Sequence, residues 1–219
     1  MKKKSRRLFW AGVGMLLAFV LWTVSVYFVD VRAIGPQGSA VGFVALNESV
    51  HRLTGVNMTL YTVTDWLGLV PIAVAFGFSV FGAVQWGKRK ALRKVDRSIL
   101  LLGGFYVLVM AVYVLFEILV INYRPVLING SLEPSYPSST TVLVLCVMPT
   151  AMMQLRARIK KNAFRRLGTL AIVAFIAFMV IGRLLSGVHW ATDILGGIFF
   201  SSGMVLLYAS VSGLAAGDA

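Results

Sequence analysis

Two strongly apolar segments of the chain are joined by Gly182-Arg183-Leu184-Leu185-Ser186-Gly187-Val188-His189-Trp190-Ala191-Thr192-Asp193. Positions four apart on a helix share a face, so the carboxylate of Asp193 can hydrogen-bond the imidazole of His189 and orient it. A histidine held by a carboxylate, with Arg183 nearby, suits phosphoryl transfer. The alternative is a hydrophilic loop with a capping polar pair, but burying these charges near a bilayer without a purpose is costly.

The composition indicates a polytopic membrane protein. Hydrophobic residues make up 58% of the chain, charged residues only 13%, and the mean hydropathy is +0.84, whereas a soluble domain carries about 25% charged residues. The length of 219 residues accommodates about six spans of roughly 20 residues each. Cys146, the single cysteine, lies in an apolar run, which excludes a disulfide framework and a cysteine-based metal site.

The net charge of +13 is concentrated in three short segments. Of the 21 basic residues, 17 lie in Met1–Arg7, Lys88–Arg97 and Arg156–Arg166. These clusters flank apolar segments, which is the positive-inside pattern of membrane proteins. The expected partners are therefore the anionic headgroups of membrane lipids, and a nucleic-acid partner is not expected.

The apolar runs predict an all-α fold with six transmembrane helices in a single domain, residues 1–219. Because the first run is long for the apolar part of a signal peptide, we expect it to be an uncleaved span with a cytoplasmic N-terminus. Alternation then places the three basic clusters and both termini in the cytoplasm, and the polar connections outside the inner (plasma) membrane. The predicted spans are Leu8–Val29, Met58–Trp86, Ile99–Asn122, Thr140–Leu155, Leu167–Leu185 and Trp190–Val211.

Three finer expectations concern single segments. Gly103-Gly104 is expected to break the third span. Asp65 is interpreted as a helix cap near the start of the second. The spacing of apolar residues in Val41–Leu53 predicts a short interfacial helix, which is either a lid over a site or a plain connection.

A second polar connection, Tyr123–Thr141, can bind an anion. It contains Arg124-Pro125, followed by Pro137-Ser138-Ser139-Thr140 at the start of a predicted helix. Hydroxyls and backbone amides at a helix N-terminus attract phosphate, although a plain helix cap has the same sequence. Arg124 and Arg183 can each bind phosphate oxygens through two hydrogen bonds.

In these residues the sequence resembles the type-2 phosphatidic acid phosphatases, integral membrane lipid phosphatases related to bacterial acid phosphatases and vanadium haloperoxidases. The family's motifs are Lys-x6-Arg-Pro, Pro-Ser-Gly-His and Ser-Arg-x5-His-x3-Asp. This chain has, in the same order, Arg124-Pro125, Pro137-Ser138-Ser139-Thr140 and Arg183-x5-His189-x3-Asp193. The resemblance covers a core of about residues 100–206, in which the first two motifs are degenerate.

The resemblance implies a role for each matching residue in the hydrolysis of a phosphorylated lipid. His189 would attack phosphorus and form a phosphohistidine, and Asp193 would orient it. The substrate phosphate would be bound by Arg124 and Arg183, with the segment Ser138-Ser139-Thr140. No metal or organic cofactor is implied.

Four departures from the family pattern bear on activity. The position of the family's lysine holds Glu117, and that of its third-motif serine holds Gly182. Ser139 replaces the second-motif glycine, and Thr140 replaces the histidine that protonates the leaving group in the family. A threonine hydroxyl is not a general acid near neutral pH.

The missing acid leaves three functions open. The first is a phosphatase that prefers a lipid or polyprenyl diphosphate, because a phosphate leaving group (pKa about 6) needs far less protonation than an alkoxide. The second is a non-enzymatic binder or transporter of a phosphorylated lipid, and the third is a structural subunit with a relic site. Glu133, Tyr136 and His51 lie on the same predicted side as His189 and are candidate substitutes for the acid.

Overall fold

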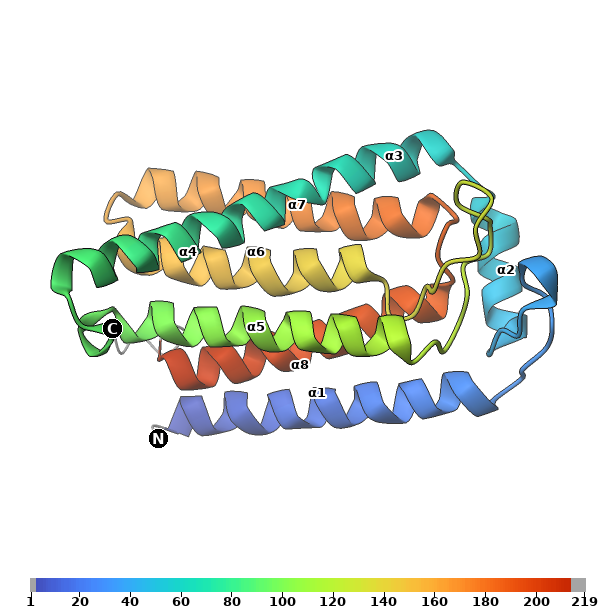
Figure 1. Cartoon of the computed structure of the whole chain (residues 1–219), viewed down its shortest axis with the longest axis horizontal. Coiled ribbons are helices and arrows are strands. Elements are labelled where there is room, and N and C mark those ends of the chain that lie inside the picture. The colour runs from blue at the N-terminus through green and yellow to red at the C-terminus, as the bar shows by residue number, and fades with distance from the viewer. Residues whose placement is uncertain (1–2, 214–219) are drawn as a thin grey trace.

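The computed structural model describes residues 3–213, and in this part of the chain the regular elements are helices. Most of them run side by side along the molecule (Figure 1). Six segments are long and apolar enough to cross a membrane, α3 and α4 together forming one of them, which confirms the all-α fold and the six spans. The helices are α1 (Lys3–Phe28), α2 (Val44–Thr54), α3 (Met58–Leu67), α4 (Leu69–Arg89), α5 (Arg97–Ile118), α6 (Ser139–Arg158), α7 (Asn162–Leu185) and α8 (Ala191–Ser212), with 3-10 turns at Pro36–Gly38 and Leu92–Lys94.

Helices α6 and α8 form the centre of the bundle. About half of each of their apolar windows is buried within the protein, 50% and 56%, against at most 22% in the other four spans. Helix α8 packs against α1, α5, α6 and α7. The outer spans therefore present their apolar side chains to lipid, and the two helices that carry the second and third motifs lie inside.

Helix α1 approaches α8 closely because glycines face each other across the contact. A Cβ atom on Gly12 would lie 3.0 Å from the carbonyl oxygen of Gly203, and one on Gly203 would lie 2.8 Å from Leu16. Small residues allow helix backbones to approach in a membrane, where packing rather than water exclusion drives association. This contact fixes the first span beside the last.

A predicted helix break and a predicted helix cap both differ from the structure. Helix α5 continues without interruption through Gly103-Gly104, because an apolar span must satisfy its backbone hydrogen bonds within the helix. The second span is divided instead at Gly68, between α3 and α4. Asp65 does not cap a helix; Asn57 caps α3, its side chain accepting a hydrogen bond from the amide of Leu60 at 2.9 Å.

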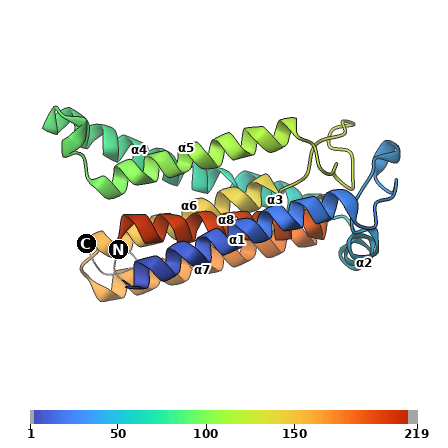
Figure 2. The same ribbon diagram turned by 90° about the horizontal axis from the view of Figure 1, so that it is seen from below.

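The long connections gather at one end of the molecule. Helix α2, which confirms the predicted short helix, lies at this end with the connection between α5 and α6 (Figure 1). The α4–α5 and α6–α7 connections lie at the other end, where the described chain also begins and finishes. Viewed from below, α4 and α5 lie on one side of the bundle and α1, α7 and α8 on the other (Figure 2). The chain termini themselves, expected in the cytoplasm, lie outside the described residues.

Candidate active site

His189 lies in the tight connection between α7 and α8, and this loop is fixed by the segment that precedes α3. Gly187 has a φ of 67°, and a Cβ atom there would lie 1.8 Å from the carbonyl oxygen of Gly55. The amide of Asn57 donates to the carbonyl of Ser186 at 2.9 Å. Ser186 itself caps α7, with its hydroxyl donating to Arg183 O at 2.7 Å. The loop therefore has one conformation and requires glycine at position 187.

Arg124 is positioned by a small hairpin in the α5–α6 connection. Asn129 and Gly130 both have positive φ, 50° and 78°, and the flanking Ile128 and Ser131 exchange two backbone hydrogen bonds. An Asn-Gly pair is the strongest short-range sequence signal for a hairpin. The hairpin is absent from the structure expected from the sequence, although this signal was present. The indole of Trp190 donates to Tyr123 O at 2.7 Å, which joins the hairpin to the loop of His189.

The two nitrogens of the His189 imidazole face opposite charges. Nε2 lies 3.3 Å from Nη1 of Arg124, and Nδ1 lies 3.7 Å from Oδ2 of Asp193. A guanidinium group only donates hydrogen bonds, so Nε2 must accept and the imidazole proton is assigned to Nδ1, toward the carboxylate. The distance to Asp193 is too long for a hydrogen bond, so the carboxylate acts on the neutral imidazole through its charge. This tautomer directs the lone pair of Nε2 toward the arginine.

Asp193 is fully buried and is held by groups from two other segments. Its Oδ2 accepts from the amide of Trp190 at 2.9 Å, and its Oδ1 accepts from the side chain of Asn122 at 3.2 Å. The side chain of Asn47 reaches the neighbouring Thr192 at 3.0 Å. Neither Asn122 nor Asn47 is among the site residues expected from the sequence. For Asn122, the one sequence signal was a polar amide residue at the end of a predicted apolar span.

Burial keeps the imidazole of His189 neutral. Desolvation, helped by the neighbouring cation Arg124 and opposed by Asp193, lowers the pKa of His189 from its ordinary value of 6.5 to about 4. His189 is only 3% exposed. At neutral pH the nucleophilic form is therefore the populated one.

Arg183 is brought to the same region but does not contact His189. Its Nη2 pairs with Asp65 at 3.1 Å, and its guanidinium carbon lies 4.7 Å from the ring centre of Tyr61. Arg124 lies over the same ring at 5.9 Å. Tyr61 thus lies next to both arginines, a role that nothing in its apolar sequence context indicated.

The three hydroxyl residues of the second motif lie in different surroundings. Helix α6 begins at Ser139, one residue before the predicted span, and the amide of Ser138 donates to Asp193 O at 3.1 Å. The hydroxyl of Ser138 is buried and accepts from Thr141 at 3.0 Å, so it serves the helix rather than a ligand. Ser139 lines a cavity with His189, whereas Thr140 does not.

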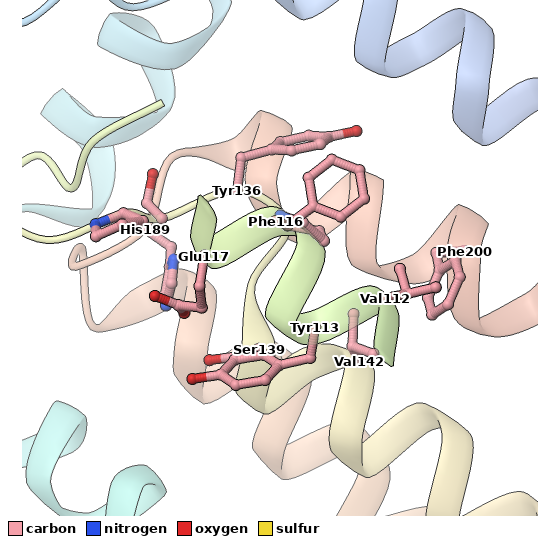
Figure 3. Close-up of a pocket in the computed structure, with 12 residues that line it drawn as sticks. Val112, Tyr113, Phe116, Glu117, Tyr136, Ser139, Val142, His189 and Phe200 are labelled. Carbon is pink, nitrogen blue, oxygen red and sulfur yellow. The ribbon is translucent and has the colours of Figure 1, made fainter. Parts of the chain in front are cut away.

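That cavity, about 410 Å³, opens beside His189 between α5, α6 and α8 (Figure 3). Its walls are largely apolar, with Val112, Phe116, Val142 and Phe200 among them. Its polar groups include Glu117 and Ser139, which lie on the same side of the cavity as His189 in Figure 3. Neither Arg124 nor Arg183 lines it. The carboxylate at the family's lysine position thus lies in the same cavity as the histidine.

Each arginine of the site is neutralised by a carboxylate. Nε of Arg124 lies 3.0 Å from Oε2 of Glu133, and Arg183 pairs with Asp65. Nε of Arg183 and Nδ1 of His189 are nevertheless buried without a hydrogen-bond partner among the described residues, and Nε of Arg124 has only its ion pair with Glu133. Buried nitrogens that lack acceptors mark a place where an anion is favourable.

The three candidate substitutes for the missing acid have different surroundings. Glu133 pairs with Arg124. The hydroxyl of Tyr136 lies 2.7 Å from that of Thr23 and points away from His189 in Figure 3. The ring of His51 lies tilted against that of Trp190 with ring centres 5.4 Å apart, its Nδ1 is buried without a hydrogen-bond partner among the described residues, and burial lowers its pKa.

The fold and the site together define a multi-pass helical membrane protein with a buried histidine placed between an arginine and a carboxylate. The chain belongs to the PAP2 superfamily, whose family model matches residues 100–214. This confirms the resemblance to the type-2 phosphatases.

Among solved structures, the fold is similar to that of the first transmembrane PAP2 type phosphatidylglycerolphosphate phosphatase from Bacillus subtilis. The TM-score is 0.53, with 19% sequence identity over 95% of this chain and 97% of that one. At this identity the likeness is one of fold. A search of curated proteins finds no match.

Proposed function

We propose that this protein is a membrane lipid phosphatase in which His189 is the nucleophile. The observation that carries the proposal is the buried, neutral imidazole with Nε2 on a guanidinium and Nδ1 facing a carboxylate. Family membership supports the reaction class, and the phosphatase named as its structural neighbour supports a phosphorylated lipid as substrate.

In the proposed reaction the substrate phosphate displaces the carboxylates from the arginines. Arg124 Nη1 moves from Nε2 of His189 to a phosphoryl oxygen, which frees the lone pair for in-line attack. The N–P bond forms as the P–O bond to the leaving group breaks. Asp193 stabilises the positive imidazole, and water then cleaves the N–P bond, releasing phosphate and restoring neutral His189.

The leaving group decides which lipids react. Thr140 supplies no acid and lies outside the cavity lining, so an alkoxide would depart with little assistance. We therefore propose a preference for a lipid or polyprenyl diphosphate, whose leaving group is a phosphate. The preference is measured as kcat/KM on a polyprenyl diphosphate and on the monophosphate of the same chain; a higher value for the monophosphate contradicts it.

The nucleophile is tested by comparing the two histidines of the chain. His189→Ala is expected to lower phosphate release from a polyprenyl diphosphate by at least about 10³-fold. His51→Ala, the matched control, removes the other imidazole beside Trp190 and is expected to retain activity within several-fold. Trapping of a radiolabelled phosphoenzyme in the wild type, absent in His189→Ala, provides a second readout; equal release by the two proteins would exclude His189 catalysis.

The degenerate motifs favour one competing function, a binder or transporter of a phosphorylated lipid without hydrolysis. Glu117 and Thr140 stand where the family has a cation and an acid, and both arginines are already paired with carboxylates. Lipid diphosphate binding that depends on Arg124 and Arg183, without any phosphate release, would favour this function.

We further propose that the site faces the outside of the plasma membrane. The basic α4–α5 and α6–α7 connections lie at the end opposite His189, which matches the positive-inside rule (Figure 1). The test uses Cys146→Ala protein with one new cysteine, Ser131→Cys near the site or Lys160→Cys at the other end. Only Ser131→Cys should react with a membrane-impermeant maleimide in intact cells; the reverse pattern would contradict the orientation.

A further inference from the structure

A cleft with three arginines lies at the end of the bundle opposite His189. It is formed where α6 ends and α7 begins, and its lining residues are Arg156, Arg165, Arg166, Thr169 and Leu170. Helix α6 has 20 residues, which at 1.5 Å per residue places its two ends about 30 Å apart. This cleft is therefore separate from the candidate active site and faces the other leaflet.

The positive charge of the cleft is not neutralised by nearby carboxylates. The sequence contains no acidic residue between Glu133 and Asp193. Arg158, on the same turn of α6 as Arg156, turns toward Asp96 at 3.6 Å. In the part of the chain that the structure describes, the three arginines of the cleft form no ion pair with a carboxylate.

Arg156 is held in place by the facing helix. Its Nε donates to the hydroxyl of Thr169 at 3.1 Å, and this hydroxyl in turn donates to the carbonyl of Arg165 at 2.7 Å. The bond uses Nε alone, so the two terminal amino groups of the guanidinium remain for another acceptor. A fixed guanidinium fork without a carboxylate partner suits a phosphate group.

A narrow apolar slot continues from the basic cleft between the same two helices. The two spaces share Arg156, Arg165 and Thr169. The slot is lined by Met152 and Leu155 of α6, by Ile159 directly after it, and by Phe164, Gly168 and Ile172 of α7. A Cβ atom on Gly168 would meet no heavy atom within 4 Å, which shows that the glycine leaves the slot open.

We propose that this cleft binds an anionic phospholipid of the leaflet opposite the active site. Its phosphate lies among Arg156, Arg165 and Arg166, and the beginning of an acyl chain enters the slot beside Gly168. The charge requires an anionic headgroup, and the continuity of the basic and apolar spaces requires a lipid rather than a free anion. This proposal does not depend on the catalytic role of His189.

Thermal unfolding of the full-length protein in a neutral detergent tests the proposal. The probes are dioleoyl phosphatidylglycerol, dioleoyl phosphatidylcholine, and inorganic phosphate at the same concentration. One variant removes the arginines (Arg156→Gln, Arg165→Gln, Arg166→Gln). Gly168→Leu keeps every charge but fills the slot, and because leucine favours helix over glycine it should not weaken α7. The matched control removes three cations from the α4–α5 segment (Lys88→Gln, Arg93→Gln, Lys94→Gln).

Saturating phosphatidylglycerol is expected to raise the Tm of the wild type and of the matched control by at least about 3 °C. The shift should fall to less than a third of this value in the arginine variant and in Gly168→Leu, and phosphatidylcholine should give no shift. An equal loss in the matched control would show unspecific charge attraction and overturn the proposal. A full shift with inorganic phosphate alone, or a full shift retained by Gly168→Leu, would also overturn it.

Discussion

Two clusters of polar side chains lie at opposite ends of the bundle, and they differ in how completely their polar atoms are hydrogen-bonded or ion-paired. The far-end cluster consists of Gln85, Asp96, Gln154, Arg158 and Tyr208. Its amides and charges are paired within the protein: Asp96 accepts from Gln85 at 2.8 Å, and Gln154 donates to Ser98 O at 3.1 Å and to the hydroxyl of Tyr208. In the candidate active site, by contrast, Nε of Arg183 and Nδ1 of His189 are buried without a hydrogen-bond partner, and Nε of Arg124 has only its ion pair with Glu133.

The difference separates a structural role from a functional one. A buried polar group with a complete set of partners stabilises the fold, because removing one partner leaves the others unsatisfied. A buried cation with an incomplete set is costly until a ligand completes it. We therefore expect substitutions at the far-end cluster to lower stability and those at the site to lower activity.

Among the substitutions that compare the two ends, the largest effect is expected at Arg124. Arg124→Gln should lower kcat/KM on a lipid diphosphate by about 10²–10³-fold, since a buried donor to the developing phosphoryl charge is lost. Its Tm should change little, because the partner Glu133 is partly exposed and can be hydrated. Arg124→Lys keeps the charge but not the two-pronged geometry, and should lie between the wild type and Arg124→Gln. A large fall in Tm would instead assign Arg124 a structural role.

The opposite behaviour is expected at Gln154, which is fully buried. Gln154→Leu removes the donor to the Tyr208 hydroxyl, one of two donors to Ser98 O and the acceptor of Arg158, and should destabilise the protein by about 1–3 kcal/mol. Unfolding measured by denaturant or heat checks this value. The activity of the folded protein should stay within about two-fold of the wild type; a selective loss of kcat would contradict the division between the two ends.

The sequence allowed a good prediction of the helices but only part of the site. Apolar runs reveal spans because a membrane demands long apolar helices. Gly103-Gly104 misled because glycine weakens a helix in water more than in lipid, where an unpaired backbone has no alternative. Within the third motif, the separation of His189 and Asp193 is local and could be predicted.

The residues that were missed come from distant segments. Asn122 and Tyr61 reach the site only because α5 and α3 pack where they do, and neither has a spacing relation to His189. The pairing of Asp65 with Arg183 depends in the same way on the packing of α3 against α7. Such contacts are set by tertiary packing, so single-sequence periodicity does not contain them.

A smaller effect is expected where the site's own carboxylate competes with substrate. Glu133 holds Arg124 in the absence of ligand, so Glu133→Gln should lower KM for a lipid diphosphate by about two- to ten-fold with kcat nearly unchanged. The matched control is Glu117→Gln, which removes one negative charge from the cavity beside His189 but leaves the pair of Arg124 and Glu133 intact. It should lower KM less than Glu133→Gln does. A raised KM in Glu133→Gln would show that the glutamate positions the arginine instead.

The smallest effect concerns pH, where the site should respond little across the neutral range. Burial lowers the pKa of His189 to about 4, so protonation should remove the nucleophile only as pH falls toward that value. The acid limb of kcat/KM reports this group in the free enzyme, provided that a substrate without a titration in this range is used. We therefore expect the limb near pH 4, and not near 6.5 as for an exposed histidine. His51→Ala, the control, should show the same acid limb as the wild type. An acid limb near pH 6.5 in both the wild type and His51→Ala would mean that His189 is solvated. That result would contradict the buried, paired arrangement of His189 on which the contrast between the two ends depends.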